Sequence, residues 1–265
     1  MTRAPGASRF RRIRIALLLV LLLFTAAWGV HTAYHRRARG SWDRPLEVGL
    51  VLLSPGGDVD AERWRAGAAA LAARIDEEMA RWRGPGGEAF HISVVGPVRF
   101  AGKLPLAPAS GGLLARARHA LDVWTTIQEI DRAAGGEAGG FDLRVFFRCA
   151  LGPENGLGFA EGSGAVNGEV ALVNGSCHGD LSLPLQAVGH ELFHTVGARD
   201  RYDGSGHARD PDGLADPERV PRYPQSHAEW MVGEIPIAPG RGRLPESLRE
   251  MQVGAATARE IGWIR

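Results

Sequence analysis

Two histidines and a glutamate lie within five positions of one another in the stretch "GHELFHTVGARDRYD", residues 189–203. If this stretch is helical, His190 and His194 are one turn apart and share a face. Two imidazoles at that spacing can bind one zinc ion, and Glu191 then lies where its carboxylate can take a proton from metal-bound water. The stretch therefore predicts a metal site with a general base. The alternative is a helix that carries two solvated histidines.

A catalytic zinc site needs a third protein ligand. Gly197 allows the chain to turn sharply after the helix, because glycine adopts positive φ without steric strain. That turn would bring Asp200 back toward the two histidines, which makes it the predicted third ligand. Other residues stay open as alternatives: His207, His227, Glu229 and Glu234.

The same residues carry a family resemblance. "HELFHTVGARD" matches the HExxHxxGxxD form of the metzincin-type zinc metallopeptidase signature and resembles snapalysin and the immune-inhibitor-A-like peptidases. The following "DRYD" is similar to the Asp-x-Tyr-Asp that the second group often shows. Residues 183–236, with "YPQ" and "HAEWMVGEIP", are also similar to uncharacterised bacterial membrane-anchored predicted peptidases.

This resemblance implies an α+β, zincin-like catalytic domain: a twisted mixed sheet with two helices behind it and a cleft floored by the zinc helix. It implies a Met-turn at Met231 and a cleft rim formed by the strand at 168–174. The implied activity is that of a zinc-dependent endopeptidase with one Zn²⁺ per chain, in which Glu191 assists the attack of zinc-bound water on a peptide bond.

The hydrophobic pattern independently predicts elements that suit this fold. Alternating strands and helices favour a parallel core covered by helices. We expect strands at 46–54, 89–100, 141–150 and 168–175, the last as an irregular hairpin or edge strand, and helices at 60–83 and 112–134. The histidine helix is expected from an N-cap at Ser182, with Pro184 in its first turn, to a stop at Gly197. Residues 198–244 should hold little regular structure, and one or two helices should close the chain.

The N-terminus is basic and then aliphatic. Residues 1–40 contain eight arginines and no acidic residue, and an uncharged run begins at Ile15. We predict a cytoplasmic segment at 1–14, a transmembrane signal anchor at 15–34, a linker at 35–45 and the peptidase-like domain at 46–265. The domain would lie in the periplasm or outside the cell. The alternative is a signal peptide cleaved near "TAA" at 25–27, which would make the protein secreted.

Charge restricts the class of partner. Beyond residue 40 the chain holds 23 basic and 30 acidic residues. An acidic body disfavours nucleic acid, which binds basic surfaces. The expected partners are a protein or peptide substrate and, through the N-terminal helix, the membrane.

The cysteines and the acidic loop supply further candidates. In an exported domain Cys149 and Cys177 would pair as one disulfide, although two buried thiols remain the alternative. Tyr202 and Tyr223 could offer a hydroxyl to an oxyanion or serve only in packing. Acidic residues in one glycine-rich loop suggest a Ca²⁺ site: Asp203, Asp210, Asp212 and Asp216.

Two other functions are compatible with a zinc site in an exported domain. One is a zinc-containing, non-catalytic module that binds peptides or envelope partners, although such a site has no need of Glu191. The other is a zinc amidase that acts on cell-wall amides.

Overall fold

The computed structural model describes residues 6–56, 58–105, 112–149, 161–164 and 168–264. The chain forms two compact units, Met1–Ser41 and Trp42–Arg265. The first unit holds one helix, α1 (Gly6–Arg39), whose aliphatic side chains from Leu17 to Phe24 are all more than half exposed. Among the helices in the described part of the chain, none is both long and apolar enough to cross a membrane. The transmembrane anchor predicted at residues 15–34 therefore gains no support.

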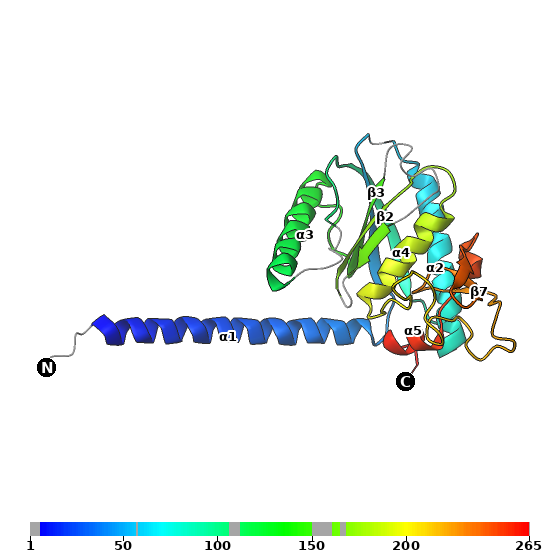
Figure 1. Cartoon of the computed structure of the whole chain (residues 1–265). Helices are drawn as coiled ribbons and strands as arrows, with labels where there is room; N and C mark the ends of the chain where they lie inside the picture. Colours follow the sequence, from blue (N-terminus) through cyan, green and yellow to red (C-terminus); the bar gives the residue numbers. More distant parts are fainter. Residues whose placement is uncertain (1–5, 57, 106–111, 150–160, 165–167, 265) are drawn as a thin grey trace. The chain divides into compact units, whose positions relative to one another are not determined.

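The second unit is built on a mixed five-stranded sheet, which agrees with the predicted α+β class (Figure 1). Its strand order is β2-β1-β3-β5-β4, with β1 (Leu46–Ser54), β2 (Phe90–Arg99), β3 (Leu143–Cys149), β4 (Glu161–Gly164) and β5 (Val170–Gly175). The first four strands in this order pair in parallel with one another, whereas β4 pairs antiparallel with β5. The edge strand beside the predicted metal helix therefore runs against the rest of the sheet.

Helices cover both faces of this sheet. Helices α2 (Ala61–Arg83) and α4 (Ser182–Thr195) pack on one face, and α3 (Leu113–Ala133) packs on the other (Figure 1). The mixed sheet with backing helices is therefore confirmed, but the helices divide between the two faces instead of lying together behind the sheet. The physical reason lies in β1, where Val48, Leu50 and Leu52 face α2 and α4 while Val51 and Leu53 face α3. A strand that is apolar on both sides needs a cover on each.

Helix α2 begins and ends where its sequence indicates. Asp60 caps α2, since its side chain accepts a hydrogen bond from the Arg63 backbone N–H at 3.0 Å. The buried stripe of α2 consists of Trp64, Ala68, Leu71, Ile75 and Met79. These residues recur at three- and four-residue intervals, the spacing that keeps one helix face against a core.

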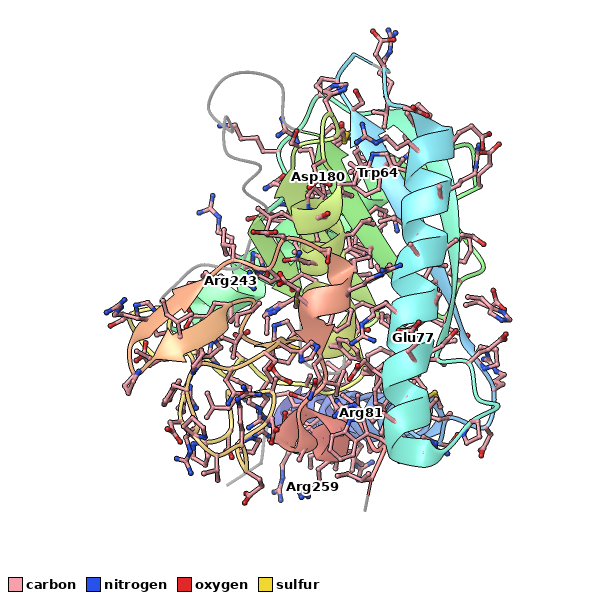
Figure 2. All side chains as sticks on the ribbon, turned by 90° about the vertical axis from the view of Figure 1, so that its right-hand side faces the viewer. Trp64, Glu77, Arg81, Asp180, Arg243 and Arg259 are labelled. Atoms are coloured by element: carbon pink, nitrogen blue, oxygen red, sulfur yellow. A yellow bond between two sulfur atoms is a disulfide. The ribbon has the colours of Figure 1, made fainter. Side chains whose placement is uncertain are left out.

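Residues 198–244 hold little regular structure, and short helices close the chain, both as predicted. This last part of the chain contains the strands β6 (Ala228–Glu229), β7 (Ile235–Ala238), β8 (Arg241–Arg243) and β9 (Met251–Gln252), the 3₁₀ helix η2 (Leu248–Glu250) and the helix α5 (Ala255–Glu260). Figure 2 shows η2 beside α4 and α2. Buried Glu78 of α2 secures this region, because it accepts the Val253 N–H at 2.9 Å and pairs with Arg74 and Arg81.

Candidate metal centre

The helix that carries the histidines has defined ends. Asp180 precedes it and accepts hydrogen bonds from the backbone N–H and the hydroxyl of Ser182, at 3.0 and 2.9 Å. Ser182 is thus the first residue of α4 rather than its predicted N-cap, and Leu181 occupies the cap position. At the other end Gly197 has φ of 115°, a conformation that strains other residues, and its N–H donates to the His194 carbonyl at 3.1 Å.

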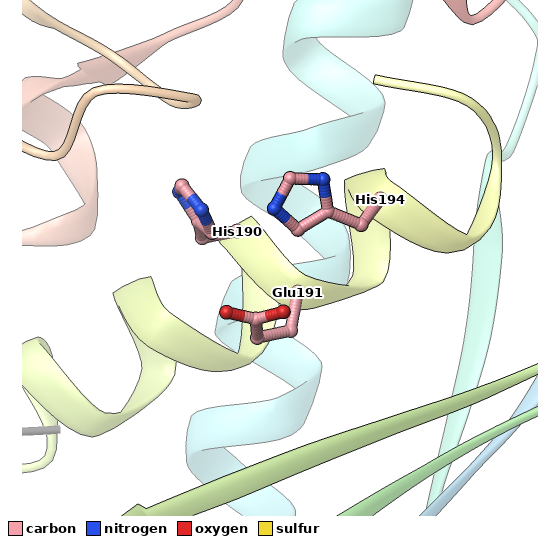
Figure 3. A group of neighbouring side chains, drawn as sticks. All are labelled: His190, Glu191 and His194. Atoms are coloured by element: carbon pink, nitrogen blue, oxygen red, sulfur yellow. The ribbon is translucent and has the colours of Figure 1, made fainter. Parts of the chain in front are cut away.

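Both imidazoles project from the same side of α4 (Figure 3), with ring centroids 4.9 Å apart. The Nδ1 atom of His190 lies 3.0 Å from the Trp230 carbonyl oxygen, and that of His194 lies 2.9 Å from the Ala198 carbonyl oxygen. Because a carbonyl oxygen can only accept, each Nδ1 carries a proton. A metal ion would bind the Nε2 atoms through the lone pairs of the neutral rings, whereas a hydrogen bond to Asp200 needs a proton on Nε2 instead.

Asp200 returns to these nitrogens after the Gly197 turn. Its Oδ1 atom lies 3.1 Å from Nε2 of His190 and 3.2 Å from Nε2 of His194. Two neutral imidazoles and a carboxylate would direct three lone pairs at the same point. Such groups repel one another unless a cation, either a proton or a metal ion, lies between them. The donor set suits zinc, whose three-ligand catalytic sites combine imidazole and carboxylate.

The titration behaviour of these groups reflects their mutual attraction. Burial alone lowers the pKa of His190, but the hydrogen bond to Asp200 and the negative charges of Glu191 and Asp200 raise it overall. Burial opposes ionisation of Asp200, yet hydrogen bonds from both histidines hold its pKa well below the usual range. The site therefore favours a positive charge between the imidazoles and the carboxylate.

Glu191 lies against the same group. Ligand atoms of His190, Glu191 and His194 are all within 4.8 Å of one another, and Glu191 is only 6% exposed. Its side chain lies on the side of α4 that faces the strands (Figure 3), and Gly162 of the edge strand β4 lies against it. A Cβ atom placed on Gly162 would come within 2.2 Å of Glu191 Oε1. Only a glycine lets β4 approach this carboxylate so closely.

The rim of the site is β4 rather than the strand predicted at 168–174. That segment forms β5, which has β3 on one side and β4 on the other. The correction follows from pairing, because β5 is bonded along both edges and β4 is the outermost strand. Nothing in the four glycine-rich residues of β4 marked them as a strand from sequence.

Met231 is fully buried, in a tight turn next to His190. The N–H groups of Val232 and Gly233 both donate to the Glu229 carbonyl at 3.0 Å, and the Met231 carbonyl accepts from Arg201 at 2.9 Å. The group that reaches His190 is the carbonyl of the preceding Trp230. The turn therefore supports the metal helix through its backbone.

A cavity of about 310 Å³ opens beside His190. Its lining includes His190, Glu191, Tyr202 and Trp230. Burial, and then the charge of Asp200, raise the pKa of Tyr202 to about 12, so its phenol stays protonated. Of the two tyrosines considered as hydroxyl donors, Tyr202 lies at the site and Tyr223 does not.

The alternative third ligands are engaged elsewhere. Glu229 is fully buried and accepts from the N–H groups of Met231 and Gly254 at 2.5 and 3.2 Å. His207 pairs with Glu234 at 3.2 Å. The charged neighbours of His227 are Arg74, Glu78, Arg81 and Glu250.

The acidic loop that suggested calcium does not bring its carboxylates together within the described residues. Asp203 caps the N–H groups of Ser205 and His207, and Asp210 bonds Arg222 and Tyr223. Asp212 lies 3.5 Å from Arg201, and the Asp216 N–H donates to Gln225. Across all the residues that the structure describes, the one group of three or more potential metal ligands is His190, Glu191 and His194.

The predicted disulfide is confirmed, since Cys149 and Cys177 are bonded with their Cα atoms 5.2 Å apart. It ties the end of β3 to the segment that precedes α4. This link therefore holds the metal helix to the sheet at the helix's N-terminal side.

No family model matches the chain, and a search of curated proteins finds no match either. The case for function therefore rests on the site itself.

Several contributors to the site were missed from sequence. They are Gly162, Gly189 and Trp230. A Cβ atom on Gly189 would lie 2.6 Å from Trp230 Nε1, so this glycine lets the turn pack directly on α4. A glycine in the middle of an amphipathic helix is the one signal that could have indicated such a close approach.

Proposed function

We propose that this protein is a zinc-dependent endopeptidase. The observation that carries the proposal is the convergence of His190 Nε2, His194 Nε2 and Asp200 Oδ1 at 3.1 to 3.2 Å, with Glu191 against the same group. Two histidines alone would suit many structural roles. A carboxylate buried beside the ligand set, opening on a cavity, suits hydrolysis.

The chain's own residues divide the work. His190, His194 and Asp200 would hold the metal, and the carbonyls of Trp230 and Ala198 fix the tautomer of each histidine. A bound zinc ion supplies Lewis acidity toward water and a carbonyl oxygen. Glu191 takes a proton from the attacking water and later delivers it to the leaving amine.

The edge strand supports a peptide as the substrate. β4 is the outermost strand, and Gly162 on it lies against Glu191. An extended chain that pairs with such an edge gains backbone hydrogen bonds without regard to sequence. That pairing would place a peptide bond of the substrate beside the general base, Glu191. The HExxHxxGxxD resemblance supports the same substrate class.

We also propose that the domain acts outside the cytoplasm. The Cys149–Cys177 disulfide supports this location, because such bonds persist in oxidising compartments and are rare in the cytosol. The basic and aliphatic N-terminal sequence is consistent with export. The location is tested by adding a protease to intact cells and to cells whose outer layer has been made permeable. If the domain is digested in neither case and only after the cytoplasmic membrane is broken, the proposed location is contradicted.

The experiment that tests the activity uses the full chain, supplied with zinc and incubated with a mixture of unstructured peptides. We expect new peptide termini by mass spectrometry, and a loss of about 10²–10⁴-fold in rate for Glu191→Gln. The variant should keep its zinc, because Glu191 is not one of the three ligands. Zinc binding and peptide binding without cleavage would contradict the proposal and favour a binding module. Cleavage of cell-wall amides but not of peptides would favour an amidase.

A further inference from the structure

Helix α3 carries large apolar side chains that do not pack on the sheet. Ile127 and Ile130 are buried against the sheet, as expected for a covering helix. In contrast, Leu114 is 88% exposed, Leu121 58% and Trp124 60%. Figure 1 shows α3 as the outer layer on its face of the sheet. A group of large apolar residues exposed on such a helix indicates a surface that binds a partner.

These exposed residues belong to a regularly spaced set, which we call the outer stripe: Leu114, Ala117, Leu121 and Trp124. Ala117 is exposed like the other three. Alternating steps of three and four positions place side chains along one side of a helix, and they are the a and d spacing of a coiled coil. The next two positions at this spacing are polar, Gln128 and Asp131. The outer stripe is therefore a short seam that fits one other helix.

The outer stripe is complementary to itself when two copies of α3 run antiparallel. If Leu114 of one copy opposes Trp124 of the other, the same register places Ala117 opposite Leu121. Two-fold symmetry then repeats both contacts with the copies exchanged. A parallel pair would instead oppose two alanines in one layer and two tryptophans in another, which would fill the seam unevenly. The antiparallel pair is therefore the better packed of the two.

The charged residues beside the outer stripe fit the same register. Arg118 follows Ala117 and Asp122 follows Leu121, so both lie on the same flank of the stripe. With Ala117 opposite Leu121, Arg118 of one copy comes within about 3 Å along the helix axis of Asp122 of the other. Opposite charges therefore meet on both sides of the symmetry axis.

We propose that α3 is a self-association surface, through which two copies of this chain form an antiparallel, two-fold symmetric dimer. Four residues from each copy make a small seam, below the about 1,200 Å² at which standard interfaces begin. The dimer is therefore reversible and dissociates on dilution. Because α3 and α4 cover opposite faces of the sheet, the dimer leaves the candidate metal centre of each copy open. The inference does not depend on zinc or on peptide hydrolysis.

The charge of the chain favours a second copy over a membrane as the partner of α3. Helices that lie on a membrane surface are rich in lysine and arginine on their polar face, whereas α3 has three arginines and three acidic residues. Beyond residue 40 the chain holds 30 acidic and 23 basic residues, which repels an anionic surface. Two copies of α3 need no excess of either sign, because the arginine of each lies near the aspartate of the other.

The first experiment is disulfide cross-linking of the full chain, in a mild detergent that disperses the exposed aliphatic side chains of α1. Cys149 and Cys177 are bonded to each other, so an introduced cysteine is the only free thiol. Isotope-labelled Ala117→Cys is mixed with unlabelled Leu121→Cys and oxidised, and mass spectrometry identifies the linked peptides. The control mixture replaces Ala117→Cys by Ala115→Cys, at an exposed position off the stripe.

We expect the Ala117→Cys mixture to form mixed dimers about tenfold faster than the control, because a disulfide needs Cα atoms within about 7 Å of each other. Equal rates in the two mixtures would mean that the copies meet through another surface, such as α1, and would overturn the inference.

The second experiment tests the register through its charges, with the dimer dissociation constant measured by analytical ultracentrifugation. Asp122→Arg places like charges across the seam and should weaken the dimer about tenfold, whereas Arg118→Asp combined with Asp122→Arg should restore the wild-type value. Both residues are exposed, so the fold should persist, which circular dichroism checks. A chain that stays monomeric at all concentrations, or a dimer that these changes leave unaltered, would overturn the inference. Binding of monomers to anionic lipid vesicles that Leu121→Glu abolishes would also overturn it and assign the outer stripe to a membrane.

Discussion

The two halves of the candidate metal centre are built by different means. His190, Glu191 and His194 stand on α4, whose register is fixed by helical hydrogen bonds and by packing on the sheet. Asp200 and the Trp230 carbonyl come from the irregular region between α4 and α5, which has only short strands and the 3₁₀ helix η2. That region is held by hydrogen bonds from backbone groups to buried side chains such as Glu229 and Glu78.

This difference has a physical consequence. A helix distributes its stability over many similar bonds, so the loss of one is tolerated. The irregular region depends on a few buried acceptors, and the loss of one leaves several N–H groups without a partner. Substituting one of these buried acceptors should therefore lower the stability of the fold by more than the few contacts of that side chain suggest.

The largest effect is expected for Glu229→Ala. This change removes the acceptor for the N–H groups of Met231 and Gly254, both of which remain buried. We expect the free energy of unfolding to fall by about 3 kcal/mol or more, as two orphaned donors require. Urea denaturation measures it. The control is Glu62→Ala, which removes an exposed ion pair with Arg65 and should change stability by less than about 1 kcal/mol. Similar values for the two variants would contradict the account.

The regular half should be sensitive to loss of its covalent link. Replacing both Cys149 and Cys177 by serine removes a bond that closes a loop with a sequence separation of 28. The loop-entropy relation predicts a loss of about 3.5 kcal/mol. Thermal unfolding of this variant should match that of reduced wild type. A double serine variant as stable as the oxidised protein would show that the sheet half does not rely on this link.

Gly189→Ala tests the contact between the two halves. The new methyl group would meet the indole of Trp230 at 2.6 to 2.8 Å, and Trp230 is fully buried. Overpacking of this kind costs about 1–3 kcal/mol, and displacing Trp230 should also weaken zinc binding through His190. Gly204→Ala is the control, since nothing lies within 4 Å of its added carbon. Unchanged zinc affinity in Gly189→Ala would mean that the halves are not coupled through this contact.

The smallest effect concerns an ion pair within the irregular region. A hydrogen bond from Arg243, followed by one from the Glu246 N–H, lowers the pKa of Glu250 from 4.5 to about 2. Because the pKa is lower in the folded state, the stabilisation is present above pH 4.5 and is lost as pH falls toward 2. Glu250→Gln should therefore be less stable than wild type at pH 6, by less than about 1 kcal/mol, and should approach it near pH 2. A difference that stays constant with pH would contradict this assignment.

The division between regular elements and the irregular region also separates what the sequence could predict from what it could not. The strand at 46–54 was found with its observed bounds, because a continuous apolar run has few alternatives. The closeness of the two histidines on α4 follows from helical spacing, and that of Asp200 from the turn at Gly197. Local patterns of this kind determine regular elements.

Other features depend on contacts between distant segments. The β4 edge strand carries no hydrophobic pattern, so only its pairing with β5 reveals it. The Trp230 carbonyl reaches His190 across 40 positions, and no periodicity links them. Coverage of both sheet faces was implicit in the apolar residues of β1, but the family resemblance directed the expectation to one side.

Zinc content of the purified full chain, measured by elemental mass spectrometry beside Asp200→Ala, tests the central claim most directly. The account predicts about one zinc ion per wild-type chain, and a content in Asp200→Ala that is largely lost on dialysis against a weak chelator. A folded wild-type protein that takes up no zinc when supplied with it would contradict the account. A variant that retains zinc as firmly as wild type would show that Asp200 is not the third ligand.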